Sequence, residues 1–205
     1  MQKVIFATGN AGKMREIRMI LADLELYGEP VEILSMKEAG IEADIVEDGK
    51  SFLDNAQIKA KAVSEFAPGA VVLADDSGLE IDYLNKEPGI YSARYMGENT
   101  PYSVKNQNLI DRLSGVPDEE RTARFVCAIA CVLPDGSILH TEAAIEGRIG
   151  YEQKGQNGFG YDPIFQVPEY GRSTAELTNE EKNRISHRGK ALRAMKEQLE
   201  NYSEK

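Results

Sequence analysis

Short apolar runs separated by amphipathic stretches predict a mixed α/β protein. Residues 4–7 are apolar enough for a buried strand, and isoleucine and leucine at positions 17, 20, 21 and 24 follow helical spacing. Residues 31–34 predict a short strand. Residues 70–74 predict a buried strand, and 79–84 form a half-buried alternation. These elements favour one continuous sheet flanked by helices.

Capping signals place three further helices. Ser51, with Asp54 at the N3 position, predicts a helix that runs to about Phe66 and ends at the following Pro-Gly. Thr100 as a cap with Pro101 at N1 predicts a helix to about residue 113. An amphipathic helix is expected over residues 186–199.

The central part of the chain predicts an antiparallel hairpin. Residues 124–133 and 137–145 read as strands, and Pro-Asp-Gly between them is a strong turn signal. Thr178 with Glu181 forms a capping box further on. We expect residues 1–205 to form one domain with two lobes, residues 80–150 forming much of the second.

Composition and charge narrow the classes of function. The 205-residue chain is 41% hydrophobic and carries a net charge of −10, an acidic balance that argues against a nucleic-acid partner. Cys127 and Cys131 share one face of a predicted strand and are expected in the core, not in a disulfide or metal site. The first residues are too soon polar for a signal peptide and no apolar run suits a membrane span, so a cytoplasmic protein is expected.

Two adjacent carboxylates are the most informative chemical feature. Asp75 and Asp76 directly follow five apolar residues, and burying two anions inside a strand is costly, so we expect them at the strand's C-terminal tip. Oxygen ligands there suit Mg²⁺ and a phosphate substrate, with Glu47 and Asp48 as candidate fellow ligands. A solvated Asp-Asp-Ser-Gly turn is the alternative.

A glycine-containing loop between a strand and a helix is the second candidate. The segment Thr8-Gly9-Asn10-Ala11-Gly12-Lys13 offers free N–H groups at a helix start, which favours an anion. It is not a Walker A loop, because Ala7 and Met14 stand where that motif needs glycine and a hydroxyl residue. A plain strand–helix turn is the alternative.

Asn55 and Lys59, four residues apart, share a face of the helix that begins after Ser51.

Two later segments are candidates for a base pocket. Gly158-Phe159-Gly160-Tyr161-Asp162 combines small residues with aromatics, which suits base stacking, although a loop with core aromatics is favoured without further context. A basic cluster then stands at a predicted helix start, where positive charge opposes the helix dipole unless an acceptor lies nearby. Its members are Lys182, Arg184, His187, Arg188 and Lys190.

Taken together, these segments resemble the inosine/xanthosine triphosphate pyrophosphatase family. The match runs in family order over almost the full length and is highly specific as a set. The segments are TGNAGK at 8–13, SFLDNAQIKAKA at 51–62, LADDSGLEID at 73–82, PGIYSARY at 88–95, GFGYDPIF at 158–165 and AELTNEEKNRISHRGKAL at 175–192.

The resemblance implies a fold and a reaction. The fold would be a long, bent mixed sheet with flanking helices and two lobes around a central substrate cleft, in a homodimer with PGIYSARY near the cleft or the dimer contact. The reaction would be Mg²⁺-dependent hydrolysis of dITP, ITP and XTP to the monophosphate and pyrophosphate. A pyrophosphatase for modified pyrimidine nucleotides and a non-catalytic nucleotide-binding protein are the alternatives.

The resemblance also implies roles for individual residues. Asp76 would activate water and bind Mg²⁺ with Glu47 and Asp75. The triphosphate would be held by the 8–13 loop, Lys59 and Ser77. The purine would meet Phe159, Gly160, Tyr161 and Asp162, with its edge facing Lys182, His187 and Arg188.

Overall fold

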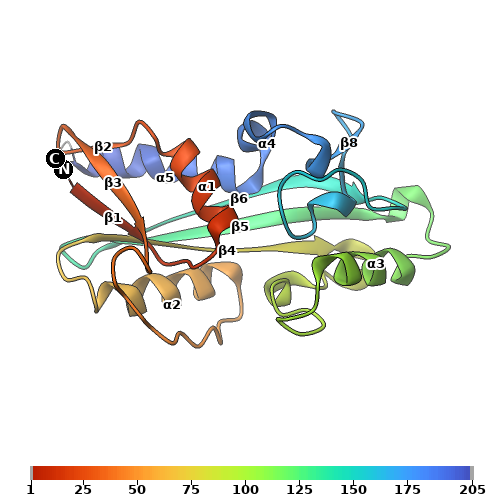
Figure 1. Cartoon of the computed structure of the whole chain (residues 1–205), viewed down its shortest axis with the longest axis horizontal. Coiled ribbons are helices and arrows are strands. Elements are labelled where there is room, and N and C mark those ends of the chain that lie inside the picture. The colour runs from red at the N-terminus through yellow and green to blue at the C-terminus, as the bar shows by residue number, and fades with distance from the viewer. Residues whose placement is uncertain (1, 204–205) are drawn as a thin grey trace. The chain divides into compact units, whose positions relative to one another are not determined.

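The computed structural model describes residues 2–203 and confirms a mixed α/β fold (Figure 1). One sheet has the strand order β2-β3-β1-β4-β5-β6-β7-β8. β1 pairs in parallel with β3 and β4, whereas the β2–β3, β6–β7 and β7–β8 pairs are antiparallel. The strands are β1 (Gln2–Phe6), β2 (Glu25–Leu26), β3 (Glu29–Ser35), β4 (Val71–Ile81), β5 (Thr122–Val132), β6 (Ile138–Ile149), β7 (Phe165–Val167) and β8 (Arg172–Ser173).

Five α-helices accompany the sheet. They are α1 (Ala11–Ile20), α2 (Phe52–Ser64), α3 (Tyr102–Arg112), α4 (Asn179–Ile185) and α5 (His187–Ser203). Within residues 2–203, none of the helices combines the length and the apolar character that crossing a membrane would require.

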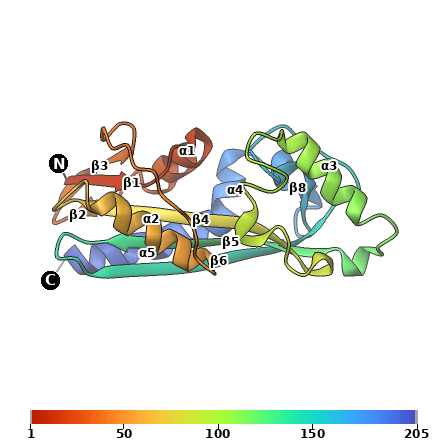
Figure 2. The same ribbon diagram turned by 90° about the horizontal axis from the view of Figure 1, so that it is seen from below.

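The chain divides into two compact units. Unit 1 contains the residues up to 76, residues 127–143 and those from 188 onward. In it, α1 and α5 cover one face of the sheet and α2 the other (Figures 1 and 2). Its core joins Phe6, Ile17, Leu73 and Met195 with Cys127. Cys127 and Cys131 are both buried in this unit, as predicted.

Unit 2 contains residues 77–126 and 144–187. Its core packs α3 against the strands through Leu79, Leu109, Phe125 and Phe165. The segment 127–143, which includes the hairpin turn, therefore falls in unit 1 and not with the rest of the central region.

Several local predictions are confirmed. The Pro-Asp-Gly turn joins β5 to β6, with the Leu133 amide donating to Ser137. Thr178 and Glu181 form the expected capping box at α4. Ser51 caps α2 by accepting from the Asp54 amide, but the Asp54 carboxylate accepts from the Lys50 amide, one residue earlier than in a capping box.

The predicted strand end at Asp75 and Asp76 is wrong. β4 continues through both residues to Ile81, as one strand of 11 residues. The neighbouring strand is the one that stops: β1 ends at Phe6, which pairs with Leu73. The two carboxylates therefore lie just past the C-terminal end of β1.

Two helix starts also differ from the predictions. α3 begins at Tyr102 with Pro101 as its N-cap, and the Thr100 hydroxyl donates instead to Met96 O. The basic cluster does not stand at one helix start, because Ser186 adopts an extended backbone (ψ 155°) that separates α4 from α5. Lys182 and Arg184 thus occupy the last turn of α4, where positive charge suits the helix dipole.

Candidate functional site

The loop between β1 and α1 forms the N-terminus of α1, and two of its side chains accept hydrogen bonds from its own backbone amides. Asn10 is the N-cap of α1, and its side-chain oxygen accepts from the Lys13 amide at 3.0 Å. The Thr8 hydroxyl accepts from the Asn10 amide at 3.2 Å. Gly9, Asn10 and Ala11 are exposed, so the positive end of this ten-residue helix faces solvent.

Asp75 is locked into buried ion pairs. Its carboxylate lies 3.0 Å from Lys13 Nζ and 3.4 Å from Arg188 Nε, and its side chain is fully buried. Arg188 also pairs with Glu16 of α1. Burial opposes the charge, but the nearby cations outweigh it and hold the pKa of Asp75 well below its usual range.

Asp76 faces a different set of partners, all on or next to α2. Asn55 Nδ2 donates to Asp76 Oδ2 at 3.1 Å, and Lys59 Nζ lies 3.4 Å from Asp76 Oδ1. Lys59 also pairs with Glu47 Oε2 at 2.9 Å. Burial raises the pKa of Asp76, although the Lys59 charge and the Asn55 hydrogen bond oppose the shift.

The adjacent aspartates contact different elements of unit 1. Successive side chains of a strand point to opposite faces, so Asp75 meets α1 and α5 while Asp76 meets α2. Within residues 2–203, no three acidic, histidine or cysteine side chains come close enough together to hold a metal ion. Glu47 and Asp76 do converge on one cation, the Lys59 ammonium. Mg²⁺ usually takes one or two carboxylates and completes its shell with water and phosphate, so these two residues fit such an ion.

In unit 2, Asp162 organises the predicted base-pocket loop. It accepts from the Phe159 amide at 2.8 Å, from Lys182 Nζ at 2.7 Å and from the Thr174 hydroxyl at 2.8 Å. Lys182 Nζ also lies 4.8 Å from the centroid of the half-buried Phe159 ring. Gly158 has φ +73°, and a Cβ there would lie 2.1 Å from Asp162 Oδ2, so both backbone conformation and space require glycine.

The neighbouring residues of the loop are fixed from α3 and the 88–95 segment. The Tyr161 hydroxyl donates to Ser92 O at 2.6 Å, and Gly160 O accepts from Asn106 Nδ2 at 3.1 Å. His187, the last residue of unit 2, is buried and stacks on Phe125, with centroids 4.9 Å apart. Ser77 follows Asp76 on β4 and is half-buried.

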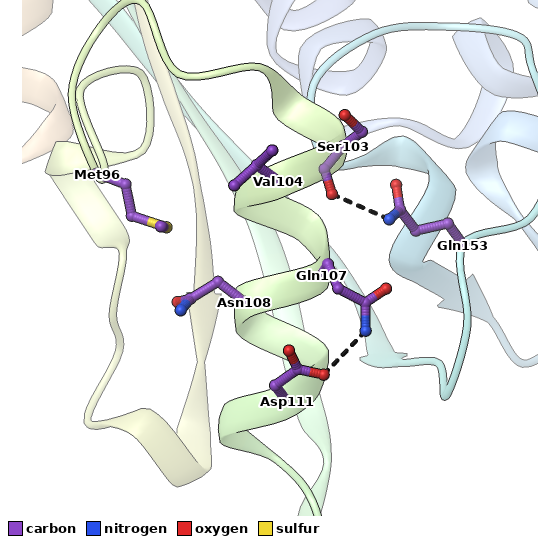
Figure 3. Close-up of a pocket in the computed structure, with 7 residues that line it drawn as sticks. All are labelled: Met96, Ser103, Val104, Gln107, Asn108, Asp111 and Gln153. Carbon is purple, nitrogen blue, oxygen red and sulfur yellow. Dashed lines mark hydrogen bonds between the residues drawn. The ribbon is translucent and has the colours of Figure 1, made fainter.

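A groove on unit 2 contains none of the predicted site residues (Figure 3). It has a volume of about 510 Å³ and runs along one side of α3, between Met96 and Gln153. Gln153 closes one edge by donating to Ser103 O at 3.0 Å. The exposed Val104 makes part of its wall apolar.

Three residues of these networks were not predicted from the sequence. Glu16 pairs with Arg188 across 172 residues, Thr174 holds Asp162, and Asn106 holds Gly160 from 54 residues away. Only Glu16 carries a local signal, since it stands three residues after Lys13 on the same helix face.

Comparison with known proteins places the chain among nucleotide pyrophosphatases. The "dITP/XTP pyrophosphatase" of Clostridium perfringens is 47% identical over 204 residues, which cover 97% of this chain and 98% of that protein. The protein of the same name from Exiguobacterium sibiricum is 45% identical, with 96% of each chain covered.

Solved structures of similar proteins share this fold. The Staphylococcus aureus Ham1 protein aligns with a TM-score of 0.84 at 36% identity, covering 98% of this chain and all of that one. A Mycobacterium abscessus structure titled "Nucleoside-triphosphatase / dITP/XTP pyrophosphatase" gives 0.73 at 40% identity, covering 95% and 98%. The family model described as "Ham1 family" matches residues 4–198. The chain therefore belongs to the Ham1 family.

Proposed function

We propose that the protein hydrolyses non-standard purine nucleoside triphosphates, namely dITP, ITP and XTP, to the monophosphate and pyrophosphate. The observation that carries this proposal is the convergence of two carboxylates and a lysine, Glu47, Asp76 and Lys59, in the same unit as an exposed helix N-terminus. The relatives named dITP/XTP pyrophosphatase support the substrate class.

The phosphate groups are assigned to unit 1. The dipole of α1 and the backbone N–H groups of Gly9, Ala11 and Gly12 favour an anion at this loop, whereas the amides of Asn10 and Lys13 already donate to side chains of the loop. Lys13 and Lys59 supply positive charge on α1 and α2. Phosphoryl transfer depends mainly on positioning and charge neutralisation, which these groups provide.

Asp76 is assigned as the base that activates water. The water oxygen attacks the α-phosphorus, its proton passes to the Asp76 carboxylate, and the bond from the α-phosphorus to the bridging oxygen breaks to release pyrophosphate. A raised pKa makes the ionised Asp76 a better proton acceptor.

Mg²⁺ is the metal we assign to this site, with Asp76 and Glu47 as its protein ligands. Bound there, the ion would neutralise phosphate charge and polarise the phosphoryl oxygens. The contacts of Asp75 with Lys13 and Arg188 favour an ion-pair role for this residue over metal ligation.

The purine is assigned to unit 2, against Phe159 and the Gly160–Asp162 segment. Hypoxanthine and xanthine carry an acceptor oxygen at position 6, where adenine carries a donor amine. Donors of unit 2 at this edge, from Lys182 or His187, would be left unpaired by adenine at about 1–3 kcal/mol each. Together, such losses approach the ~10⁴-fold discrimination that polar mismatch can reach.

A homodimer is the assembly we propose, because the family resemblance implies one. Tyr91, Met96 and Val104 of unit 2 expose 58, 47 and 47% of their surface and are candidate contacts in such a dimer. Sedimentation of the protein and of a Val104→Glu variant tests this: the protein is expected to sediment as a dimer and the variant as a monomer. A monomeric unmodified protein would refute the dimer.

The test of function is pyrophosphate release with Mg²⁺ from dITP, XTP, dATP and dGTP at equal concentration. Release from dITP and XTP only, lost in Asp76→Asn, is the expected result. Equal release from all four would refute the base-edge assignment. Tight dITP binding without any release would refute catalysis. Modified pyrimidine triphosphates are assayed alongside, and faster release from them than from dITP would favour that substrate class instead.

A further inference from the structure

Asn55 connects two parts of the proposed catalytic site that are far apart in sequence. It is fully buried in the first turn of α2, and both ends of its side-chain amide are used. Nδ2 donates to Asp76 Oδ2 at 3.1 Å, and Oδ1 accepts from the Gly49 amide at 2.9 Å. One small side chain thus links β4 to the 47–50 segment.

The 47–50 segment lies close to α2 because residue 49 is glycine. A Cβ at Gly49 would lie 2.6 Å from Asn55 Oδ1 and 2.7 Å from Asp54 Cβ, which is too close for any other residue. Its φ is not positive, so the requirement is for space and not for an unusual backbone conformation. Glu47 lies two residues earlier and contacts Lys59 at 2.9 Å.

We propose that Asn55 is a positioning residue that fixes the Asp76 carboxylate relative to Glu47. The amide does this because its two ends are chemically different: the NH₂ must face the carboxylate and the oxygen must face the Gly49 N–H. Lys59 alone leaves Asp76 free to rotate, since an ammonium bonds without a fixed plane. The proposal rests on the function proposed above and adds a residue to its site.

Asn55→Asp separates the two halves of this link. The carboxylate has the shape of the amide and can still accept from the Gly49 N–H, but it cannot donate to Asp76. Asn55→Leu removes both bonds, and Gly49→Ala disturbs the link from the other end. Gln57→Glu makes the same amide-to-carboxylate change two residues away on α2, where the side chain is half-exposed, and is the matched control.

The first measurement is steady-state hydrolysis of dITP. For Asn55→Asp we expect kcat to fall by about 10–100-fold, the range seen for residues that orient a metal ligand. The KM should stay within about threefold of the unmodified protein, because the 8–13 loop is untouched. Gly49→Ala should also lose kcat, and Gln57→Glu should lose none. An Asn55→Asp variant with unchanged kcat, or a Gln57→Glu variant with an equal loss, would overturn the proposal.

The second measurement is independent of activity. NMR of the carbon-13-labelled protein follows the side-chain carboxyl of Asp76, and amide exchange follows the Gly49 N–H. Asn55→Asp is expected to shift the Asp76 signal while Gly49 stays protected, and Asn55→Leu is expected to change both. An Asp76 signal that no Asn55 variant moves would overturn the proposal. If the unmodified protein releases no pyrophosphate but these signals respond as expected, the proposed function fails and the link between Asn55, Asp76 and Gly49 stands.

Discussion

Asp75 and Asp76 are neighbours in β4, yet their carboxylates contact side chains of different helices. Asp75 binds Lys13 and Arg188, whereas Asp76 accepts from Asn55 and contacts Lys59. Two chemically identical residues therefore have different roles, and substitutions should separate them.

Asp76→Asn is expected to lower dITP turnover by about 10²–10⁴-fold, the typical contribution of a general base, with little change in melting temperature. Asp75→Asn is expected to destabilise the fold by about 3–5 kcal/mol, because Arg188 and Lys13 lose a buried counterion. Denaturant unfolding and turnover, measured on both variants, check this. If Asp75→Asn unfolds like the unmodified protein, the ion-pair role is refuted.

Lys182→Met is expected to raise the KM for dITP by about tenfold or more, with kcat changed much less, because the charge-assisted bond that holds Asp162 and the Phe159 loop is lost. The measurement is the kcat and KM of the variant. Lys154→Met, which removes an exposed lysine of the same unit, is the control and should leave both constants unchanged. A change in kcat alone would contradict the assignment of this loop to the purine.

Arg121 is buried and donates to three backbone carbonyls, Leu113 O, Ile149 O and Gly150 O, at 2.7–2.9 Å. Lysine lacks the planar fork of donors, so Arg121→Lys should leave at least one buried acceptor unsatisfied, at about 1–3 kcal/mol. Chemical unfolding measures the loss. Arg148→Lys, at an exposed ion pair with Asp118, should change stability by less than about 1 kcal/mol. Equal losses of stability in the two variants would show that the three hydrogen bonds from Arg121 to backbone carbonyls do not stabilise the fold.

The pKa of Glu38 is lowered to about 2, first by the Ser35 amide and then by the Ser35 hydroxyl; burial opposes this shift, and Arg18 adds a smaller lowering. A lowered carboxyl pKa stabilises the fold above the unfolded value of 4.5, and this contribution is lost as the pH falls from 4.5 towards 2. The melting temperatures of the unmodified protein and Glu38→Gln should therefore differ more at pH 7 than at pH 3. Glu42→Gln, in the same loop, is the control. A difference that does not depend on pH would contradict the titration of Glu38.

Local sequence signals predicted the structure correctly where one short stretch of chain determines it. Three examples are the β5–β6 turn, the capping box of α4 and the buried cysteines. The charge of Asp75 led to the wrong prediction that the strand ends there. The free-energy cost of burying a carboxylate depends on its partners, and its partner Arg188 lies 113 residues away in sequence. The break between α4 and α5 was not predicted. It results from the extended backbone of Ser186, a conformation that the residue type does not indicate.

In the candidate site, too, residues with a local sequence signal were predicted and residues that act through distant contacts were not. The residues that offer groups to a ligand, such as Thr8, Lys59 and Phe159, stand in segments with recognisable local chemistry. Residues that hold other parts of the site, such as Asn106 at Gly160 and Thr174 at Asp162, make contacts 54 and 12 residues away in sequence, which no local pattern predicts.

Unit 1 is assembled from three separate stretches of chain, and the last of them begins at Arg188. During synthesis, the ribosome makes Asp75 113 residues before the arginine that neutralises it. A nascent chain that has not yet released α5 therefore cannot complete this unit, however much of the rest has emerged. Premature termination before residue 188 would leave the Asp75 carboxylate without its arginine, and such fragments are expected to be substrates for cellular proteases and not shortened enzymes.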